Sequence, residues 1–520
     1  MSSNYYSVEV INDIEYIRFL DHDLILTLQN YFPHENLFRN ALPAKNLLSI
    51  LNSFRKDYGS YFPDLINWIE EQYEDEIMLI EIMTENGFIE FDNLTLLFPK
   101  GQYVRTNSHE TIIGAKVIRS YYDNEIFVII VEVICSDGCS FIHLICDHAF
   151  ELWIGLRKID KLPIIPLLKE DKFYNKLVER GKKFIKYAIG HHFFQHSSKS
   201  SKGRVMVDAS RYKGKLINLE YDDDEDYIKE MKKMDYVEEE ELFMCAPQLP
   251  VYSFVWKDWY LIDVEHLSEI SFDDEAFDKL VLDQTRKSLI ESLVKVEYSK
   301  TDIINNKDDG CTFLLHGPPG VGKTLTAEAI SEKLHRPLYS ISVGELGTNA
   351  KDLEGKLREI FDLAYAWNAI ILIDEVDIFL ERRNVLEVDR NALVCVFLRL
   401  LDYHQGIVFL TTNRVNCFDD AFKSRISISL EYKELDVKAR ETLWSTFLEF
   451  SDYEPNNVNI KKLSDIHLNG REIKDAVKLA KALNKEKNEE HYLKEIKGSL
   501  EFMTKTTNKI RRKSDSERNL

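Results

Sequence analysis

Apolar residues recur at three- and four-residue spacing through much of the first 88 residues, as in NLLSILNSFRKDYGSYFPDLINWIEEQY. That spacing places apolar side chains on one face of an α-helix, so the pattern predicts a helical segment over residues 1–88. Over residues 89–265, short β-branched and aromatic runs alternate with turn residues, which is typical of strands. The run VEVICSDGCSFIHL predicts a β-hairpin that turns at Asp137-Gly138. We therefore expect a mixed, β-rich domain after the helical segment.

One stretch of this β-rich domain breaks the pattern. Residues 220–241, EYDDDEDYIKEMKKMDYVEEEE, are dominated by Asp and Glu. A charge run of this kind is usually a solvated surface segment, so we expect an acidic insert; a docking site for a basic partner is the alternative. Aromatic-rich chain returns at residues 244–263 and closes the domain.

Between residues 266 and 435, short apolar runs alternate with helical patterns. The runs CTFLLHG, PLYSISV, AIILIDE and GIVFLTTN have the length and β-branched content of buried strands. Strands that alternate with helices form a parallel sheet with helices on both faces, so the fold class of this region is α/β. Residues 436–500 carry helical patterns and predict a small helical domain, and residues 501–520 form a polar tail.

Composition limits the classes of function. Hydrophobic residues make up 44% of the 520, enough for several cores, and the formal net charge is −21. So acidic a chain lacks the basic face of a general nucleic-acid binder, and we expect no such activity. The apolar run at residues 126–134 is too short to cross a bilayer and contains Glu132, so we expect no membrane span. Seven scattered cysteines and a first segment without the features of a secretory signal favour the cytoplasm or nucleus.

The stretch LLHGPPGVGKT, residues 314–324, carries the clearest chemistry. It fits the spacing G-x-x-x-x-G-K-[ST] and lies between a buried strand and a helix. Glycines in such a loop let backbone N–H groups turn onto phosphate oxygens, while the lysine reaches the terminal phosphates and the threonine hydroxyl binds Mg²⁺. The loop therefore predicts a nucleotide site. The residues expected to contact the nucleotide are Gly317, Pro318, Pro319, Gly320, Val321, Gly322, Lys323, Thr324 and Leu325.

Two further strand ends supply polar groups. The run AIILIDEVD predicts a buried strand that ends at Asp374, followed by Glu375, and VFLTTN predicts another that ends at Asn413. Ligands bind at the carboxyl ends of strands in open α/β sheets. Asp374 can therefore hold Mg²⁺ with Thr324, and Glu375 can polarise a water for attack on the γ-phosphate. Asn413 can orient that water, although an asparagine at a strand end is also a common turn former.

Together these motifs resemble the AAA family of ATPases, within the AAA+ superfamily. The resemblance covers about residues 272–485 and rests on GPPGVGKT, LIDEVD, TTN, FDDAFKSRI and NGREI. It implies a P-loop AAA+ core over 266–435, a helical lid over 436–500, and hydrolysis of ATP with Mg²⁺. It also implies that Asn413 is a sensor of the γ-phosphate and that Arg471 is the sensor of the lid. Arg425 resembles the arginine finger, which reaches the γ-phosphate at a neighbouring subunit's site. There it and the Lys323 of that site neutralise the charge that develops.

The same resemblance implies an assembly. A homo-oligomeric ring, a hexamer, would remodel a macromolecule, and the N-terminal domain would select a protein substrate or adaptor. The segments LFPKGQYV, LVERGKKF, GRVMVDASRY and VWKDWYLIDV are similar to a fungal branch of the family with an uncharacterised amino-terminal domain. One feature departs from the many members that thread polypeptide: no aromatic residue lies between Val343 and Leu357, and Leu346 is the large apolar candidate at the loop tip.

Alternatives remain at this point. Cys135, Cys139, Cys146 and His148 fit no common zinc pattern, and we expect buried strand cysteines. The histidines at 191, 192 and 196 are expected to be a mixture of surface and core residues rather than a metal site. An ATP-dependent scaffold with little turnover, a small-molecule kinase and a nucleic-acid motor remain alternatives to an ATPase that remodels a partner.

Overall fold

The chain divides into two units, Met1–Ile270 and Ser271–Leu520. The computed structural model describes the following residues: 5–11, 14–29, 36–106, 111–123, 125–197, 202–214, 232–295, 310–347, 349–380, 388–402, 404–414, 420–451, 460–483, 496 and 498. Within these residues, every helix is too short or too polar to cross a membrane.

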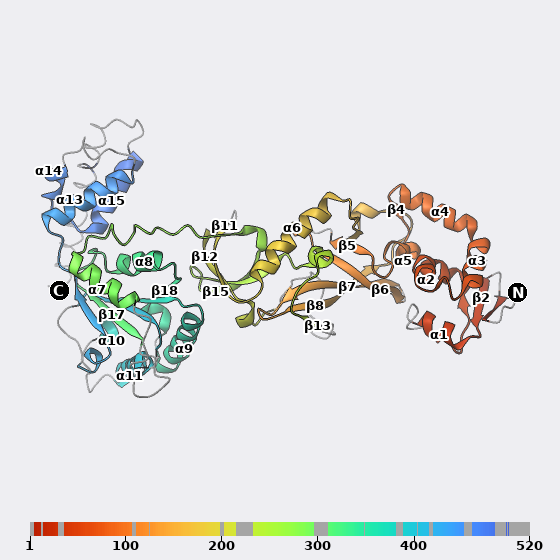
Figure 1. Cartoon of the computed structure of the whole chain (residues 1–520), viewed down its shortest axis with the longest axis horizontal. Coiled ribbons are helices and arrows are strands. Elements are labelled where there is room, and N and C mark those ends of the chain that lie inside the picture. The colour runs from red at the N-terminus through yellow and green to blue at the C-terminus, as the bar shows by residue number, and fades with distance from the viewer. Residues whose placement is uncertain are drawn as a thin grey trace, which may run out of the picture. The chain divides into compact units, whose positions relative to one another are not determined.

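The first part of the N-terminal unit combines helices with a small antiparallel sheet of order β1-β2-β3 (Figure 1). The prediction of a helical segment over residues 1–88 missed this sheet. Tyr6, Ile17 and Phe19 are buried, because the alternating pattern of β1 and β2 turns apolar side chains to one face. The elements are β1 (Tyr6–Ile11), β2 (Ile14–Phe19), α1 (His22–Gln29), β3 (Leu42–Pro43), η1 (Ala44–Ile50), α2 (Leu51–Tyr58), α3 (Pro63–Gln72) and α4 (Glu74–Glu85).

A six-stranded antiparallel sheet of order β10-β5-β6-β7-β8-β13 follows, with the long helix α6 packed against its core. The predicted hairpin is confirmed: β7 and β8 pair from Ile126↔Glu151 to Ser136↔Phe141. The Asp137 carboxylate closes the turn by accepting from the backbone N–H groups of Cys139 and Ser140. The elements are β4 (Phe88–Ile89), η2 (Phe91–Asn93), α5 (Leu94–Leu97), β5 (Tyr103–Thr106), β6 (Gly114–Asp123), β7 (Ile126–Ser136), β8 (Phe141–Glu151), β9 (Arg157–Lys158), η3 (Ile159–Lys161), β10 (Ile164–Pro166) and α6 (Lys172–Tyr187).

The structure describes the second half of the acidic insert. Residues 220–231 lie outside the described part of the chain, but residues 232–244 are described. Lys232 to Met234 form β13, which pairs with β8, and η6 (Glu239–Met244) buries Leu242, Phe243 and Met244. The end of this segment therefore packs on the domain rather than being solvated throughout.

The N-terminal unit ends in a second, five-stranded antiparallel sheet of order β15-β14-β12-β11-β16. β16 follows β15 after only the three residues of η7, yet it pairs with β11 at the opposite edge of the sheet. Three residues span about 10 Å at most, so the sheet must curl until its two edges approach, as a partly closed barrel. The elements are β11 (His192–Ser197), β12 (Lys202–Val207), η4 (Ala209–Arg211), β14 (Gln248–Ser253), β15 (Asp258–Asp263), η7 (Val264–His266) and β16 (Leu267–Ser268).

The second unit is built on a parallel sheet of order β18-β19-β20-β17-β21. One face shares a core with α7 and α8, where Phe313 and Phe409 stack beside Ala327 and Ile330. Leu314 and Ile371 point to the other face of the sheet and are equally buried. Both faces of the sheet are therefore covered, as the α/β prediction required. The edge strand β21 is an element that the sequence patterns did not single out.

The elements of this core are α7 (Gln284–Lys295), β17 (Cys311–His316), α8 (Lys323–Lys333), β18 (Leu338–Ser342), η8 (Val343–Leu346), α9 (Ala350–Ala366), β19 (Ile370–Asp374), α10 (Asp377–Leu380), α11 (Val388–Asp402), β20 (Ile407–Thr412), α12 (Asp420–Lys423) and β21 (Ile428–Glu431).

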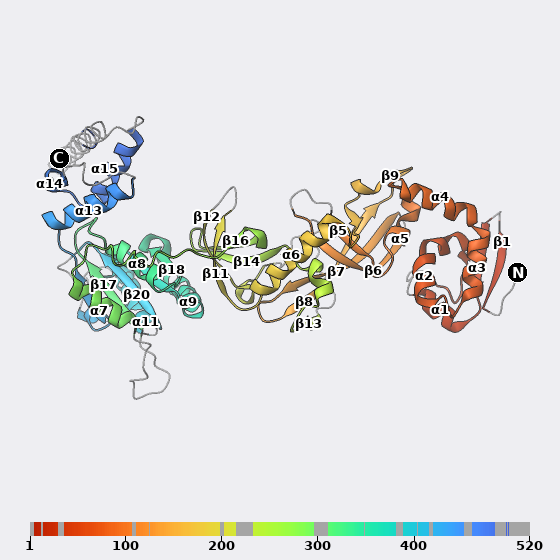
Figure 2. The ribbon, with the colours of Figure 1, turned by 45° about the horizontal axis from the view of Figure 1, so that its top comes forward.

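Three helices follow the sheet and have a core of their own: α13 (Val437–Glu449), α14 (Ile460–Ser464) and α15 (Gly470–Leu483). They lie side by side as a small bundle around Trp444, Leu448 and Ile473 (Figure 2). The buried Arg440 ties the bundle together, since its guanidinium donates to the carbonyl oxygens of Ser464 and Leu435. Residues 501–520, expected to be a polar tail, lie outside the described residues.

Candidate active site

Three glycines of the loop between β17 and α8 adopt backbone conformations that disfavour any side chain. Gly320 and Gly322 adopt φ values of 75° and 102°, in the left-handed region that disfavours side chains. Gly317 has φ 148°, and a Cβ there would lie 2.0 Å from the carbonyl oxygen of Tyr432. Gly322 then caps α8, which places the helix N-terminus and its free N–H groups at the loop. The loop thus has the geometry that its sequence predicted.

Lys323 lies inside this loop, with only 7% of its surface exposed. Its ammonium donates to the carbonyl oxygens of Gly317 and Pro318, both at 2.8 Å, and to Asn413 Oδ1 at 2.9 Å. Burial lowers the pKa of Lys323, and the nearby carboxylates of Asp374 and Asp377 act in the opposite direction. The positive charge of Lys323 is therefore buried in the loop where the sequence predicts the terminal phosphates of the nucleotide.

The order of strands explains how Asn413 reaches the loop. β20 lies between the P-loop strand β17 and the acidic strand β19. In the parallel register, His316 of β17 lies beside Thr412 of β20, so the residues after each strand meet at one edge of the sheet. Asn413 consequently lies beside Lys323, at the end of the strand next to the one that ends at Asp374.

Asp374 ends β19 and faces two hydroxyl groups. Thr324 Oγ1 lies 3.3 Å from Asp374 Oδ2, and Thr411 Oγ1 donates to Asp374 Oδ1. A hydroxyl and a carboxylate are the hard oxygen ligands that Mg²⁺ prefers, so the pair Thr324 and Asp374 fits the ion that the loop implies. The metal assignment of these two residues remains a proposal, supported by their distance.

Glu375 follows in a strained backbone conformation, with φ 58°. Its N–H donates to Thr411 Oγ1 at 3.1 Å, and the N–H of Val376 donates to the Thr411 carbonyl oxygen at 2.9 Å. These two bonds hold the turn after the strand, while the Glu375 side chain is exposed. A non-glycine residue held at positive φ beside a phosphate loop is the kind of strain that functional sites retain.

The lid contacts the loop directly. The N–H of Gly470, the first residue of α15, donates to the carbonyl oxygen of Gly320 at 2.9 Å. Asn469 and Glu472 cap the same helix reciprocally, which fixes where α15 begins. Arg471 is exposed, and its charge further lowers the pKa of Lys323, so it lies near the loop. The geometry thus brings the predicted lid residue to the nucleotide site.

Arg425 has partners away from this cluster. Its guanidinium forms an ion pair with Asp402 at 2.8 Å and donates to the carbonyl oxygen of Ala421 at 2.7 Å. The structure therefore brings together Lys323, Thr324, Asp374, Glu375, Asn413 and Arg471 and leaves Arg425 apart from them. An arginine that acts on a neighbouring subunit would lie outside its own chain's site.

Sequence reasoning missed three supporting residues. Thr411 and Thr412 are fully buried polar residues, with exposures of 1% and 0%, and Thr412 Oγ1 donates to Asp377. Asp377 also accepts from the N–H of Asn413 at 3.3 Å. Two consecutive threonines at the end of an apolar strand were a visible signal, because buried hydroxyls need partners.

The large apolar side chain in the loop after β18 is buried rather than exposed. Leu346, the apolar candidate at its tip, is 0% exposed and packs inward. A capping box between Ser342 and Glu345 holds the turn around it. Leu346, the large apolar candidate in this loop, is therefore not exposed to grip a polypeptide.

The metal alternatives of the N-terminal unit gain no support. Among the described residues, no group of three or more His, Cys, Asp or Glu side chains is placed to hold a metal ion. Cys135 is buried with the pKa of its thiol raised by burial, and Cys146 has a pKa of about 12 for the same reason. Such thiols stay protonated and pack as small apolar residues.

Comparison with known proteins identifies part of the chain. Residues 313–434 match the model of the ATPase family associated with various cellular activities, AAA. Residues 80–170 match a domain of unknown function, DUF7025. The AAA match covers the strands and loops that carry the site described above.

Three curated relatives each match about a third of the chain. A putative 26S proteasome regulatory subunit homolog of Methanothermobacter thermautotrophicus is 32% identical over 174 residues, covering 32% of this chain and 46% of the relative. Nuclear valosin-containing protein-like of Mus musculus is 31% identical over 168 residues, covering 30% and 19%. ATPase family gene 2 protein of Schizosaccharomyces pombe is 32% identical over 163 residues, covering 29% and 20%. The chain thus spans less than half the length of these relatives.

Proposed function

The chain carries an ATPase domain of the AAA family, and from this premise we propose that it binds ATP with Mg²⁺ and hydrolyses it to ADP and phosphate. The observation that carries the proposal is the meeting of three strand ends. They bring Lys323, the pair Asp374-Glu375 and Asn413 to one edge of the sheet. A protein that only held nucleotide would not need Glu375 there.

Each residue has a distinct task in this proposal. The loop N–H groups and Lys323 bind the phosphates, and Lys323 neutralises charge that develops on the γ-phosphate. Thr324 and Asp374 would hold Mg²⁺, which supplies charge neutralisation between the β- and γ-phosphates when bound. Glu375 accepts the proton of the attacking water or orients it. Asn413 positions the water or the γ-phosphate, and its amide leaves Lys323 for this task.

We further propose a ring of identical subunits, a hexamer, that remodels a protein partner. In it Arg425 would exchange its bond to Asp402 for the γ-phosphate at the neighbouring subunit, and Arg471 would couple nucleotide state to the lid. The unit Met1–Ile270, which contains the domain of unknown function, would select a protein substrate or adaptor in the cytoplasm or nucleus. The buried Leu346 favours remodelling without the usual threading grip.

The ATPase proposal is tested by phosphate release from the purified protein and from Glu375→Gln. We expect turnover to fall by about 10²–10⁴-fold, the usual contribution of general acid–base catalysis, while ATP binding is retained. Glu359→Gln is the matched control, since Glu359 is exposed on α9 away from the cluster. Equal rates for the wild type and Glu375→Gln would contradict the ATPase proposal and favour an ATP-dependent scaffold with little turnover.

The composite site is tested by mixing two inactive variants, Lys323→Ala and Arg425→Ala. If Arg425 acts on the neighbour, mixed rings contain some intact sites and recover part of the activity. Mixtures that stay as inactive as their components would refute the assignment of Arg425. Phosphate release that DNA or RNA stimulates at low salt, and that salt suppresses, would favour a nucleic-acid motor instead.

A further inference from the structure

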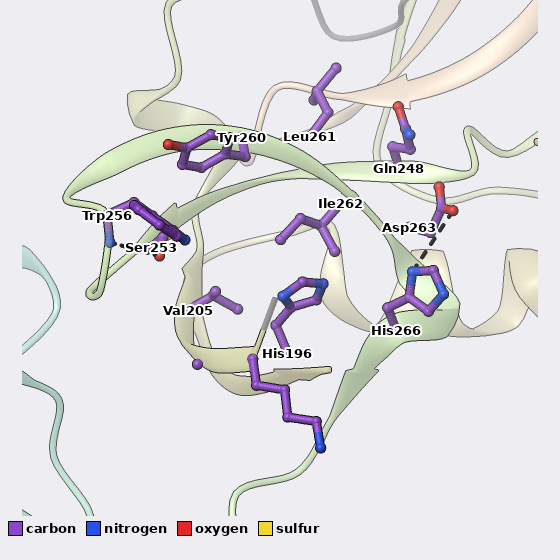
Figure 3. Close-up of a pocket in the computed structure, with 12 residues that line it drawn as sticks. His196, Val205, Gln248, Ser253, Trp256, Tyr260, Leu261, Ile262, Asp263 and His266 are labelled. Carbon is purple, nitrogen blue, oxygen red and sulfur yellow. Dashed lines mark hydrogen bonds and ion pairs between the residues drawn. The ribbon is translucent and has the colours of Figure 1, made fainter. Parts of the chain in front are cut away.

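A cavity of about 500 Å³ lies in the partly closed barrel that ends the N-terminal unit, where Figure 3 shows His196, Val205 and Tyr260 around it. The carboxylate among its lining residues, Asp263, already interacts with the buried Arg180. The described lining therefore does not select an occupant for this barrel cavity. The hydrogen bonds around a buried tyrosine of the second unit, in contrast, do point to a role in the nucleotide site.

Tyr432 is the first residue after β21 and begins the connection to the lid, whose first helix, α13, starts at Val437. Its backbone lies against the beginning of the phosphate loop. The Tyr432 N–H donates to the carbonyl oxygen of His316 at 2.7 Å, and the Tyr432 carbonyl oxygen would lie 2.0 Å from a Cβ on Gly317. The backbone of Tyr432 thus fixes where the loop leaves β17.

The side chain of Tyr432 reaches towards the other end of the same loop. Its hydroxyl oxygen lies 2.8 Å from Thr326 Oγ1 on α8, and Thr326 Oγ1 lies 3.0 Å from the carbonyl oxygen of Gly322. A carbonyl oxygen only accepts, so Thr326 donates its proton to Gly322 and accepts one from Tyr432. Burial raises the pKa of Tyr432 to about 12, so the hydroxyl keeps the proton that it donates.

The carbonyl group at the end of this chain of hydrogen bonds belongs to the peptide unit between Gly322 and Lys323. Its oxygen accepts from the N–H of Thr326 as well as from the hydroxyl, both at 3.0 Å. A trans peptide unit is planar, so its N–H points away from its carbonyl oxygen. Holding the Gly322 carbonyl against α8 therefore turns the Lys323 N–H into the loop, where phosphate oxygens are expected.

Both hydroxyl groups are shielded from solvent. Tyr432 is 5% exposed and Thr326 is 1% exposed, so water has little access as a substitute partner if either hydroxyl is removed. A residue that only filled this space would need no hydroxyl, since phenylalanine has nearly the same volume. The hydroxyl of Tyr432 thus has a purpose beyond packing, and its hydrogen bonds lead to a phosphate-binding peptide unit.

We propose that Tyr432 is a positioning residue of the nucleotide site. Through Thr326 its hydroxyl holds the Gly322 carbonyl and so aims the Lys323 N–H at the phosphates, while its backbone holds the other end of the loop at Gly317. The residue that begins the connection to the lid therefore also sets the geometry of the loop. This inference rests on the proposed ATPase function, because it concerns how the same loop binds nucleotide.

The test is titration of the full chain with a fluorescent, non-hydrolysable ATP analogue in the presence of Mg²⁺. Tyr432→Phe removes only the hydroxyl, and we expect the Kd for the analogue to rise about three- to tenfold. Thr326→Val should raise the Kd by a similar factor, whereas Thr326→Ser keeps the hydroxyl and should bind like the wild type. A double variant that combines Tyr432→Phe with Thr326→Val should bind no more weakly than Thr326→Val alone, because both changes break one chain of hydrogen bonds.

Two control variants separate positioning from loss of stability. Tyr122→Phe also removes a tyrosine hydroxyl, one that is bonded to the backbone of Phe91 and Leu94 in the N-terminal unit. Ile330→Val shortens a buried side chain of α8 one turn beyond Thr326, and should lower the thermal stability of the second unit. Both controls should leave the Kd for the analogue within about twofold of the wild type.

Hydrogen–deuterium exchange of the nucleotide-free protein provides a measurement that does not depend on binding. If Tyr432 holds the loop, the amides of residues 317–324 should exchange several-fold faster in Tyr432→Phe than in the wild type. Ile330→Val should not show this local acceleration, because it leaves the hydrogen bonds to the loop intact.

An unchanged Kd in Tyr432→Phe would overturn the proposal and leave the tyrosine as a packing residue. Additive losses in the double variant, or binding by Thr326→Ser as weak as that by Thr326→Val, would show that the hydroxyls do not act in one chain. A wild type that binds no ATP analogue would contradict the ATPase proposal instead. In that case unchanged exchange of residues 317–324 in Tyr432→Phe would overturn the positioning role, and faster exchange would support it.

Discussion

Individual hydroxyl groups hold the acidic end of the nucleotide site together. Thr411 contacts both members of the acidic pair, since its Oγ1 donates to Asp374 and accepts from the Glu375 N–H. Thr411 is 1% exposed, so these groups have no access to water as a substitute partner. It is a positioning residue, because it acts on the proposed reaction only through its two neighbours.

Replacing Thr411 with Val, which has the same shape, removes both hydrogen bonds. Loss of a buried hydrogen bond to a charged group costs about 1.5–3 kcal/mol, so we expect kcat to fall roughly 10- to 100-fold. ATP affinity should change little, because Lys323 and the loop are untouched. Thr411→Ser keeps the hydroxyl and should restore most of the rate; a serine variant as slow as the valine variant would contradict the role of Oγ1.

The buried imidazole of His404 makes the free energy of unfolding depend on pH. His404 is 4% exposed, and burial lowers its pKa to about 4, while a hydrogen bond with the Gly406 backbone acts in the opposite direction. Its pKa in the unfolded chain is about 6.5, so the unfolded state binds more protons between these values. The stability contributed by neutral His404 is therefore present above about pH 6.5 and is lost as the pH falls towards 4.

His404→Phe keeps a ring beside Phe361 but cannot titrate. We expect the wild type to lose about 1 kcal/mol more than this variant between pH 7.5 and 5.5. Urea unfolding at the two pH values measures the difference. Parallel losses in the two proteins would mean that His404 is not the titrating group.

The ends of the strands determine which residues meet at the nucleotide site. β20 lies between β17 and β19 and thereby sets Asn413 beside Lys323, although about 90 residues of chain separate Lys323 from Asn413. Two glycines of the second unit have unequal constraints. Gly317 lies against the Tyr432 backbone, whereas Gly355 in α9 has open space where a Cβ would stand.

These two glycines make a matched pair for substitution. Gly355→Ala should stabilise the second unit by about 0.5–1 kcal/mol, because alanine loses less backbone entropy within a helix. Gly317→Ala should destabilise it by more than about 1 kcal/mol, because the new Cβ meets backbone that cannot move aside. Thermal unfolding measures both changes; two shifts of the same sign would contradict the geometry of the loop.

The whole molecule consists of two units with separate cores, divided at Ile270 and Ser271. The N-terminal unit holds the barrel cavity and the second unit holds the nucleotide site. Because the groups of the nucleotide site come from the second unit alone, nucleotide is expected to stabilise that unit and not the N-terminal one.

Calorimetry of the full chain tests this division. We expect at least two unfolding transitions, and a non-hydrolysable ATP analogue at about 100 times its Kd should stabilise only the second unit, by about 2.7 kcal/mol. Gly317→Ala identifies the transition of that unit, because it should shift the same peak. A single transition that moves as a whole with the analogue would show that the units unfold as one.

The sequence by itself determined the phosphate loop, the buried strands with Asp374 and Asn413 at their ends, and the hairpin at Asp137-Gly138. These features depend on residues that are neighbours in the chain, where local spacing and backbone conformation suffice. The first sheet, β1-β2-β3, was missed because residues 1–88 also carry long helical patterns that outweighed two short alternating strands.

Only the tertiary structure decided which distant groups meet. The bonds of Thr411 to the acidic pair, the contact of Gly470 with Gly320 and the burial of Leu346 all follow from strand order and from packing between elements. The second sheet of the N-terminal unit is the clearest case, since β16 follows β15 in the chain yet pairs with β11 at the far edge of the sheet. Such pairings have no local period in the sequence, because they are set by which surfaces can be buried together.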